Sequence, residues 1–364
     1  MKTCCFPTLW PCLPLLAAVL ASCSPLPSGG EGTLSLVLSV PGGTTKALSD
    51  ASAYAYEEAV NQVQLLLFKD GSRYDYLSLD AASVSFPYTK SYTSLGAGAY
   101  RIYAVANGPD LSAVRTETAL LGTSICLTDC GLSASQGFVM MDGAGVQVDA
   151  GSRSEVTLRM LRYASRVRVT SIRNQLPAAY AAGGAMTIKG IFLINALQTW
   201  NLGATGSPTG WLNLGGREAG HAASTERQHY IASAAQVPSA FRAHLFLSPS
   251  VSLSRSQAYQ PSAACLYSLP NGVTQDHPGP EATENTGAPA RLVVLAQVNG
   301  TDWWYPVTLV HEGKGLERNT TYDVALTFCA SGSADPNEPV TESQLVATVS
   351  RSGWVDGPSY SEPL

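Results

Sequence analysis

Hydrophobic and polar residues alternate most regularly in a short segment near the N-terminus. The segment from Thr33 to Val40 has an aliphatic residue at every second position: Leu34, Leu36, Leu38 and Val40. Because successive side chains of a strand point to opposite faces, this period predicts a β-strand with one apolar face. Burial of four such side chains contributes about 6–12 kcal/mol before entropy is counted. The strand is therefore expected to fill a groove between two sheets.

Short runs rich in β-branched and aromatic residues continue along the chain, and turn residues separate them. With 33 Gly, 22 Pro and only 13% charged residues, the composition is typical of β-sandwiches and not of helical bundles or doubly wound sheets. One helical turn is expected within residues 54–60. We predict strands over residues 63–68, 100–105, 138–141, 155–161, 166–172, 186–194, 243–247, 292–298, 305–310, 322–328 and 345–349.

The length of 364 residues favours two domains over a single core. Tyr163 separates two of the predicted strands, and we place the domain boundary there. The expected organisation is a leader over residues 1–22 and a tether with the first strand over 23–46. An N-terminal β-sandwich follows over 47–163, and a C-terminal β-sandwich with a tail over 164–364.

The first residues have the pattern of a bacterial lipoprotein leader. Lys2 supplies a positive charge, and Leu13 to Ala21 form an apolar run that is too short to span a bilayer of roughly 30 Å. The small side chains of Ala21 and Ser22 precede Cys23, which cleavage would expose for acylation. Two or three acyl chains anchor a protein firmly. An ordinary secretory signal with a chance cysteine is the alternative.

The segment that follows the first strand is small and polar, and it contains a single basic residue. Lys46 is the only Lys or Arg between Cys23 and Lys69. Because exposed loop tips are favoured sites of proteolysis, a trypsin-like protease would cut between Lys46 and Ala47. The cut would detach lipid and strand together and open the groove for a strand of another subunit. The alternative is an ordinary first strand followed by a solvated lysine.

Ten sequence blocks, in order along the chain, resemble the fimbrillin family, the subunits of type V pili. They are EEAVNQVQLLLF (57–68), GAYRIYAVAN (98–107), FVMMDG (138–143), VTLRMLR (156–162), IFLIN (191–195), CLYSLPN (265–271), WYPVTL (304–309), RNTTY (318–322), GSADPNEPV (332–340) and Trp354. The resemblance implies an all-β fold with two transthyretin-like β-sandwich domains in tandem. It also implies a lipoprotein precursor, maturation by a trypsin-like protease and polymerisation by donor-strand exchange.

Carried over to this sequence, the resemblance makes Cys23 the lipidation site and Lys46–Ala47 the maturation bond. The donor strand would lie within residues 344–364. The family protease usually cuts after arginine, whereas this chain has Lys46. The tail beyond Trp354 contains prolines, which cannot donate to a strand ladder. The better donor candidate is the strand whose one face carries Leu345, Ala347 and Val349.

Charge and motifs exclude several classes of function. Of 22 basic side chains, Lys2 lies in the leader, so 21 remain against 27 acidic ones, a net charge of −6. This argues against nucleic-acid binding. No catalytic motif and no cofactor motif stands out, so an enzyme is not expected. The expected partners are other copies or related fimbrial subunits, the outer membrane, a trypsin-like surface protease, and a host protein or glycan.

Four cysteines follow Cys23, and export favours disulfides. Cys126 and Cys130 are close enough in sequence to bridge, while Cys265 and Cys329 are either a second bridge or free thiols. No metal site is expected, because no histidine pair lies near the cysteines and none of the five histidines has ligand spacing.

Two further groups of residues each allow two interpretations. Asp335, Asn337 and Glu338 offer oxygen ligands for calcium, but the neighbouring prolines favour a fixed turn. Among the aromatic residues, Trp303 to Tyr305 fit a core strand, whereas Trp200 and Trp211 flank a loop and are candidates for glycan contact.

The sequence therefore predicts an exported structural subunit that polymerises into a surface fimbria and supports adhesion. The alternatives are a non-polymerising tip or anchor subunit and a surface glycan-binding lipoprotein.

Overall fold

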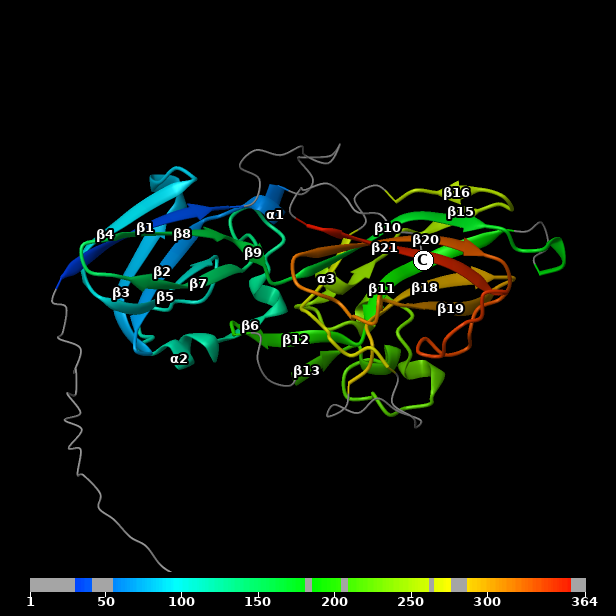
Figure 1. Ribbon diagram of the computed structural model, residues 1–364. Helices are drawn as coiled ribbons and strands as arrows, with labels where there is room; N and C mark the ends of the chain where they lie inside the picture. Colours follow the sequence, from blue (N-terminus) through cyan, green and yellow to red (C-terminus); the bar gives the residue numbers. More distant parts are fainter. Residues whose placement is uncertain are drawn as a thin grey trace, which may run out of the picture.

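The computed structural model describes residues 30–40, 55–180, 185–203, 209–261, 265–275 and 287–354. The predicted leader, Cys23, and the Lys46–Ala47 bond lie outside the described residues. Strands dominate these ranges, and the predicted all-β class with tandem β-sandwiches is confirmed (Figure 1).

Two sheets in the first half of the chain face each other, as the left side of Figure 1 shows. The smaller sheet has the order β4 (Tyr88–Gly96), β1 (Glu31–Ser39) and β8 (Arg153–Arg159). The larger sheet has the order β3 (Ser72–Asp80), β2 (Gln62–Lys69), β5 (Gly98–Ala106), β7 (Met140–Val148) and β9 (Leu161–Arg162). Side chains from both sheets form the core between them, and β1 supplies Leu34, Leu36 and Leu38 to it.

The second half has two larger sheets. In one, the order is β16 (Ala258–Tyr259), β10 (Ser165–Asn174), β20 (Thr320–Phe328) and β21 (Leu345–Gly353), and β17 (Cys265–Ser268) also pairs with β10. In the other, the order is β14 (Phe246–Leu247), β11 (Met186–Ile194), β18 (Arg291–Val298) and β19 (Thr301–Thr308), and β15 (Val251–Leu253) also pairs with β11.

A third, small sheet links the two halves of the chain. Its order is β13 (Thr209–Leu212), β12 (Ala196–Asn201) and β6 (Ser124–Cys126), so a strand of the first half pairs with strands of the second. Apart from this pairing, the strands before and after Tyr163 form separate sheets. The predicted domain limits themselves stay a prediction.

Helices are short in the described residues. The α-helices are α1 (Ala55–Glu58), α2 (Glu117–Leu121) and α3 (Arg242–Leu245). The 3-10 helices are η1 (Ala81–Ser83), η2 (Leu127–Asp129), η3 (Ala178–Tyr180), η4 (Leu214–Gly216), η5 (Arg227–His229) and η6 (Ala234–Gln236).

Most predicted strands are present, and the errors have physical causes. The strand predicted over 138–141 instead continues to Val148, because the glycines of β7 allow close approach: a Cβ on Gly143 would lie 2.2 Å from the Tyr103 ring. The strand predicted over 243–247 is mostly α3, a short helix ending at Leu245. β3 and β4 were not predicted, since their Ser, Thr and Tyr residues give a weak apolar period.

We expect Leu36→Ala to lower the free energy of unfolding by about 2–5 kcal/mol, because Leu36 is fully buried in the centre of β1. The half-buried neighbour Val37 provides a matched control on the other face of the strand, and Val37→Ala should cost less. Denaturant unfolding of the uncleaved protein measures both values. Equal losses at the two positions would contradict the packing of β1 described above.

Candidate functional site

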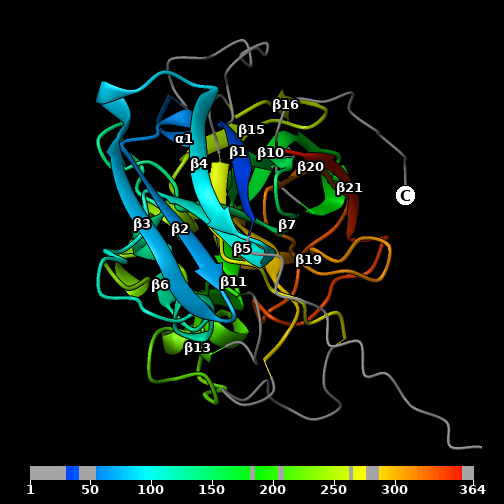
Figure 2. The same ribbon diagram turned by 60° about the vertical axis from the view of Figure 1, so that its left-hand side comes forward.

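β1 is the internal strand of its sheet and is bound along both edges. It pairs antiparallel with β4, from Glu31 opposite Gly96 to Leu38 opposite Tyr88, and parallel with β8, from Thr33 opposite Arg153 to Ser39 opposite Arg159. Figure 2, turned toward this end of the molecule, shows β1 beside β4. Removal of β1 would therefore leave two unpaired strand edges facing a strand-wide gap.

The removable strand predicted from sequence coincides with this element. Leu34, Leu36 and Leu38 have no exposed surface, and Val40 is half-buried just beyond the end of the strand. The predicted apolar face is thus the face that enters the core. Whether β1 leaves the protein is not decided by its position, and the predicted cleavage at Lys46 and lipidation at Cys23 stay predictions.

The start of β1 is fixed by close backbone contacts. A Cβ on Gly32 would lie 2.5 Å from both the Asp149 carbonyl oxygen and a Val148 methyl group. The Thr33 N–H donates to Ser152 O at 2.9 Å, and the Gly151 N–H donates to Glu31 O at 2.9 Å. The strand therefore begins in a single register that a larger residue at position 32 would disturb.

A buried charged cluster lies where α1 meets the second half of the chain; we call Glu57, Arg162, Arg166, Tyr267 and Trp354 the Glu57 cluster. The Glu57 carboxylate accepts from Arg166 Nη1 at 2.5 Å, from the Tyr267 hydroxyl at 2.6 Å and from Trp354 Nε1 at 3.1 Å. Arg162 Nε donates to the Glu57 carbonyl oxygen at 2.6 Å. Three elements distant in sequence thus share one carboxylate.

Aromatic rings enclose these charges. The guanidinium groups of Arg162 and Arg166 lie 5.0 Å and 4.9 Å from the Trp354 ring centroid, within the range of cation–π attraction. Phe138 packs on Tyr267 and on Trp354. Burial and the nearby Glu57 carboxylate both raise the pKa of Tyr267, so its hydroxyl stays protonated and donates to Glu57.

The Glu57 cluster also joins the first described helix to the residue that follows the last strand. α1 is the first element after the segment that holds Lys46, and Trp354 follows β21, the predicted donor strand. Figure 1 shows the end of β21 approaching α1 between the two halves. The sequence did not reveal this cluster, because its members are separated by as many as 297 positions.

β21 is fully incorporated in its own sheet. It pairs with β20 over nine positions, from Phe328 opposite Leu345 to Thr320 opposite Gly353. Two of the predicted donor residues, Leu345 and Val349, are buried, and Ala347 is half-buried. On the outer face, Val346 is 50% exposed. Donation by β21 would thus require its separation from β20.

The predicted disulfide between Cys126 and Cys130 is not formed, and no disulfide joins Cys265 to Cys329. η2 separates the two cysteines, and the Cys126 N–H is held by the Asp129 carboxylate at 2.7 Å. Cys130 instead lies in the core with no exposed surface. Burial raises the pKa of Cys130 to about 12, which keeps the thiol protonated and unreactive.

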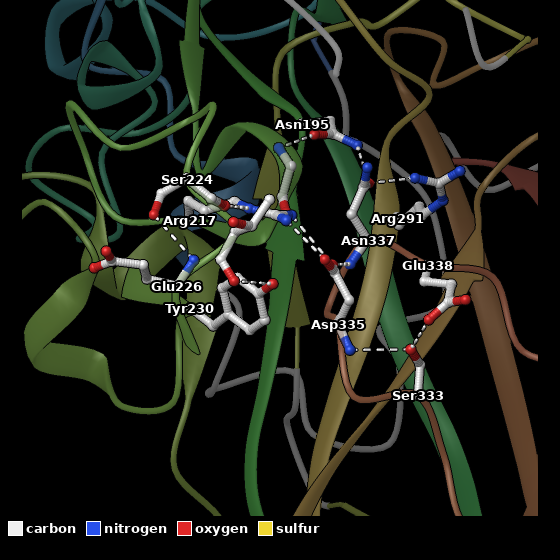
Figure 3. A network of polar contacts seen from close by, with 12 residues as sticks. Asn195, Arg217, Ser224, Glu226, Tyr230, Arg291, Ser333, Asp335, Asn337 and Glu338 are labelled. Carbon is white, nitrogen blue, oxygen red and sulfur yellow. Dashed lines mark hydrogen bonds and ion pairs between the residues drawn. The ribbon is translucent and has the colours of Figure 1, made fainter. Parts of the chain in front are cut away.

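The loop of Asp335, Asn337 and Glu338 is held by protein contacts (Figure 3). Arg217 donates to both Asp335 oxygens, at 2.7 Å and 3.1 Å, and the Ser333 hydroxyl donates to Glu338 at 2.7 Å. Asn337 accepts from Arg291 through its side-chain oxygen. Because Arg217 neutralises Asp335 and the side-chain oxygens of Asn337 and Glu338 already accept hydrogen bonds, the fixed-turn interpretation fits the structure better than calcium binding.

The tryptophans differ in how deeply they are buried. Trp304 is buried in β19 and donates from Nε1 to Ile231 O at 2.9 Å, in agreement with the core interpretation. Trp200 and Trp211 are both half-buried. Trp211 lines a hollow of about 220 Å³ together with Asn213, Arg217 and Glu218.

The sequence did not predict one group of candidate metal ligands. Glu218, His221 and His229 each place a possible ligand atom within 4.8 Å of the others. The spacing of 3 and 8 positions matches no standard motif, so only the folding of the loop reveals the group.

Comparison with known proteins bears on the family. Residues 32–153, which run from β1 through β7 to the first residue of β8, match the model of the family described as major fimbrial subunit protein (FimA). The resemblance to fimbrillins is confirmed. The family that this model describes consists of fimbrial subunits, a structural and non-enzymatic class of protein. No curated protein sequence matches the chain.

Solved structures with the same fold cover nearly the whole chain. The fimbrilin FimA of Porphyromonas gingivalis W83 is 11% identical, with a TM-score of 0.56, and the alignment covers 89% of this chain and 97% of that one. A candidate cell adhesion protein of Bacteroides eggerthii is 18% identical, with a TM-score of 0.58 and coverages of 90% and 97%. The tip fimbrial protein Mfa3 of P. gingivalis, with a C-terminal truncation, is 12% identical, with a TM-score of 0.52 and coverages of 88% and 100%. At these identities the likeness shows the fold.

Within the described residues, none of the helices has the length and apolar character needed to cross a bilayer.

We expect Glu57→Gln to destabilise the protein by about 3–5 kcal/mol, because it leaves the buried Arg166 charge without its partner. The control is Glu155→Gln, which removes one partner of an exposed pair with Arg153 and should change stability by less than about 1 kcal/mol. Thermal or denaturant unfolding measures both. A neutral Glu57→Gln would show that the cluster does not hold the two halves together.

Proposed function

We propose that the chain is a structural subunit of a cell-surface fimbria that polymerises by donor-strand exchange and supports adhesion. Its precursor is exported, acylated at Cys23 and anchored in the outer membrane. A trypsin-like protease then cuts between Lys46 and Ala47, and β1 leaves with the lipid. The single observation that supports this proposal best is the placement of β1 between β4 and β8, with both edges paired and one face in the core.

A groove that β1 had left would have to bind a replacement strand. Without β1, the sites of Leu34, Leu36 and Leu38 would expose apolar surface, and β4 and β8 would expose backbone donors and acceptors. A strand from a second subunit meets both demands if it carries aliphatic side chains at alternate positions. Its backbone bonds then supply affinity, and its side chains select the register.

β21 is the donor that we propose, through Leu345, Ala347 and Val349. These residues share the period of two that the groove requires, and β21 is an edge strand with β20 as its one partner in the sheet. Its release breaks that pairing and also withdraws Trp354 from the Glu57 cluster. Glu57, the carboxylate of this cluster, lies ten residues beyond Ala47 along the chain.

A second candidate function is a terminal or anchor subunit that accepts a strand but donates none. The nine paired positions of β21 and the burial of Leu345 and Val349 favour it, because donation must first undo them. Such a subunit would still carry β1 or an exchanged strand, but it would end a fibre.

Lys46→Ala tests the proposed maturation. We expect trypsin to leave the variant with its β1, and the cells to carry lipidated monomers whose N-terminal residue is Cys23. The matched control is Lys46→Arg, which preserves the charge and should be cut before Ala47 and form detergent-resistant ladders. Normal fibres from Lys46→Ala would exclude this bond as the maturation site.

A reversible cross-link between β20 and β21 tests the donor. Ala325 and Thr348 lie opposite each other in register, half-buried and exposed respectively, so Ala325→Cys with Thr348→Cys can form a bridge across the two strands. If β21 donates, the oxidised variant should remain monomeric after trypsin, and reduction should restore ladder formation. Polymerisation of the oxidised form would place the donor elsewhere, and failure in both forms, with wild-type protein also monomeric, would favour the terminal subunit.

A further inference from the structure

Glu218, His221 and His229 form a compact group on one loop of the second half. The Glu218 carboxylate lies 2.6 Å from His229 Nδ1, and the rings of His221 and His229 stack with centroids 3.6 Å apart and planes 9° from parallel. Glu226 adds a second carboxylate, 3.5 Å from His229 Nε2. His221 is exposed, while Glu218 and His229 are half-buried, so the group is accessible from solvent.

The backbone of the loop holds these side chains in place. One turn is closed by the His221 N–H donating to Glu218 O at 3.1 Å, and a second by the His229 N–H donating to Glu226 O at 3.0 Å. The Glu218 N–H donates to His229 O at 3.0 Å and so joins the two turns. The three groups therefore come from a hydrogen-bonded scaffold and not from independent surface side chains.

The two neighbouring arginines, Arg217 and Arg227, contact other side chains. The Arg217 guanidinium forms a two-point ion pair with Asp335 and lies 4.6 Å from the Tyr230 ring centroid, as the network in Figure 3 illustrates. The Arg227 guanidinium lies 5.3 Å from the Trp304 ring centroid. Neither is paired with the Glu218 carboxylate in the described contacts, and the side chain that contacts this carboxylate is that of His229.

We infer that Glu218, His221 and His229 bind one divalent transition-metal ion of the zinc class. Two imidazole nitrogens and one carboxylate oxygen are a donor set that zinc accepts, with a fourth position left for water or for Glu226. A metal bonds to such atoms at about 2.0–2.1 Å, which places the ligand atoms of a tetrahedral site about 3.3 Å from one another. The three groups already lie within 4.8 Å, and the contact of 2.6 Å between Glu218 and His229 must open slightly if both of these atoms bind the ion.

Binding also changes the ring stack in a defined way. A nitrogen lone pair lies in the plane of its imidazole ring, so two parallel rings cannot direct their lone pairs to one point. The exposed His221 must therefore tilt out of the stack, while the scaffold keeps His229 and Glu218 in place. The bound ion would cross-link the two turns and stiffen the wall of the 220 Å³ hollow that Glu218 lines. This inference does not depend on the proposed polymerisation.

The test is titration of the metal-free full-length protein with Zn²⁺ by calorimetry, together with thermal unfolding. We expect one ion per chain and a higher unfolding temperature in its presence. Co²⁺ at the same site should give the visible absorption of a four-coordinate ion.

Three variants separate the site from adventitious binding. His221→Ala removes an exposed ligand, so it should leave the fold intact and weaken Zn²⁺ binding at least tenfold. Glu218→Gln should weaken binding similarly. The matched control is Glu312→Gln, which makes the same change beside a lone histidine, His311, at 4.0 Å, and should bind Zn²⁺ as the wild type does. Absence of one-to-one binding in the wild type, or unchanged affinity in His221→Ala, would overturn the inference.

Discussion

The need to pair both edges of the groove between β4 and β8 governs the first sandwich. In this structure β1 meets that need with backbone hydrogen bonds on two sides and three fully buried leucines. β1 precedes the other described strands along the chain. One peptide-bond cleavage after β1 is therefore enough to turn it into a separate ligand of the groove, whereas a strand in mid-chain would need two. The same contacts that stabilise the precursor therefore define what any replacement strand must supply.

The Glu57 cluster connects α1, which follows β1 in the chain, to the second half of the chain. Its carboxylate joins α1, β10, β17 and the residue after β21, so the first described helix contacts the residue that follows the proposed donor strand. A buried ion pair is costly to break by removing one partner but is not in itself strongly stabilising. Its value here is specificity: it fixes how the ends of the chain lie against the two halves.

Local patterns predicted the parts of the fold that depend on local period. β1, β11 and β20 stand where their alternating or apolar residues place them, and the apolar face of β1 is the buried one. β3 and β4 were missed because their polar residues give no clear period, and each is held by a strand of a different sheet, β2 and β1 respectively. The Glu57 cluster and the Glu218, His221 and His229 group were missed because their members meet only after the chain has folded. The disulfide between Cys126 and Cys130 was inferred from spacing alone, and the sulfur of Cys130 proved to face the core.

We propose that side-chain packing and backbone hydrogen bonds hold β1 in its groove, and that a strand of another subunit can replace it. The most direct test uses protein cut after Lys46 and a synthetic peptide with the sequence of residues 31–40, added in excess during polymerisation. The account predicts that the peptide occupies the groove and stops ladder formation, whereas the same peptide with Leu36→Asp does not. Ladders that grow equally well with either peptide would contradict it.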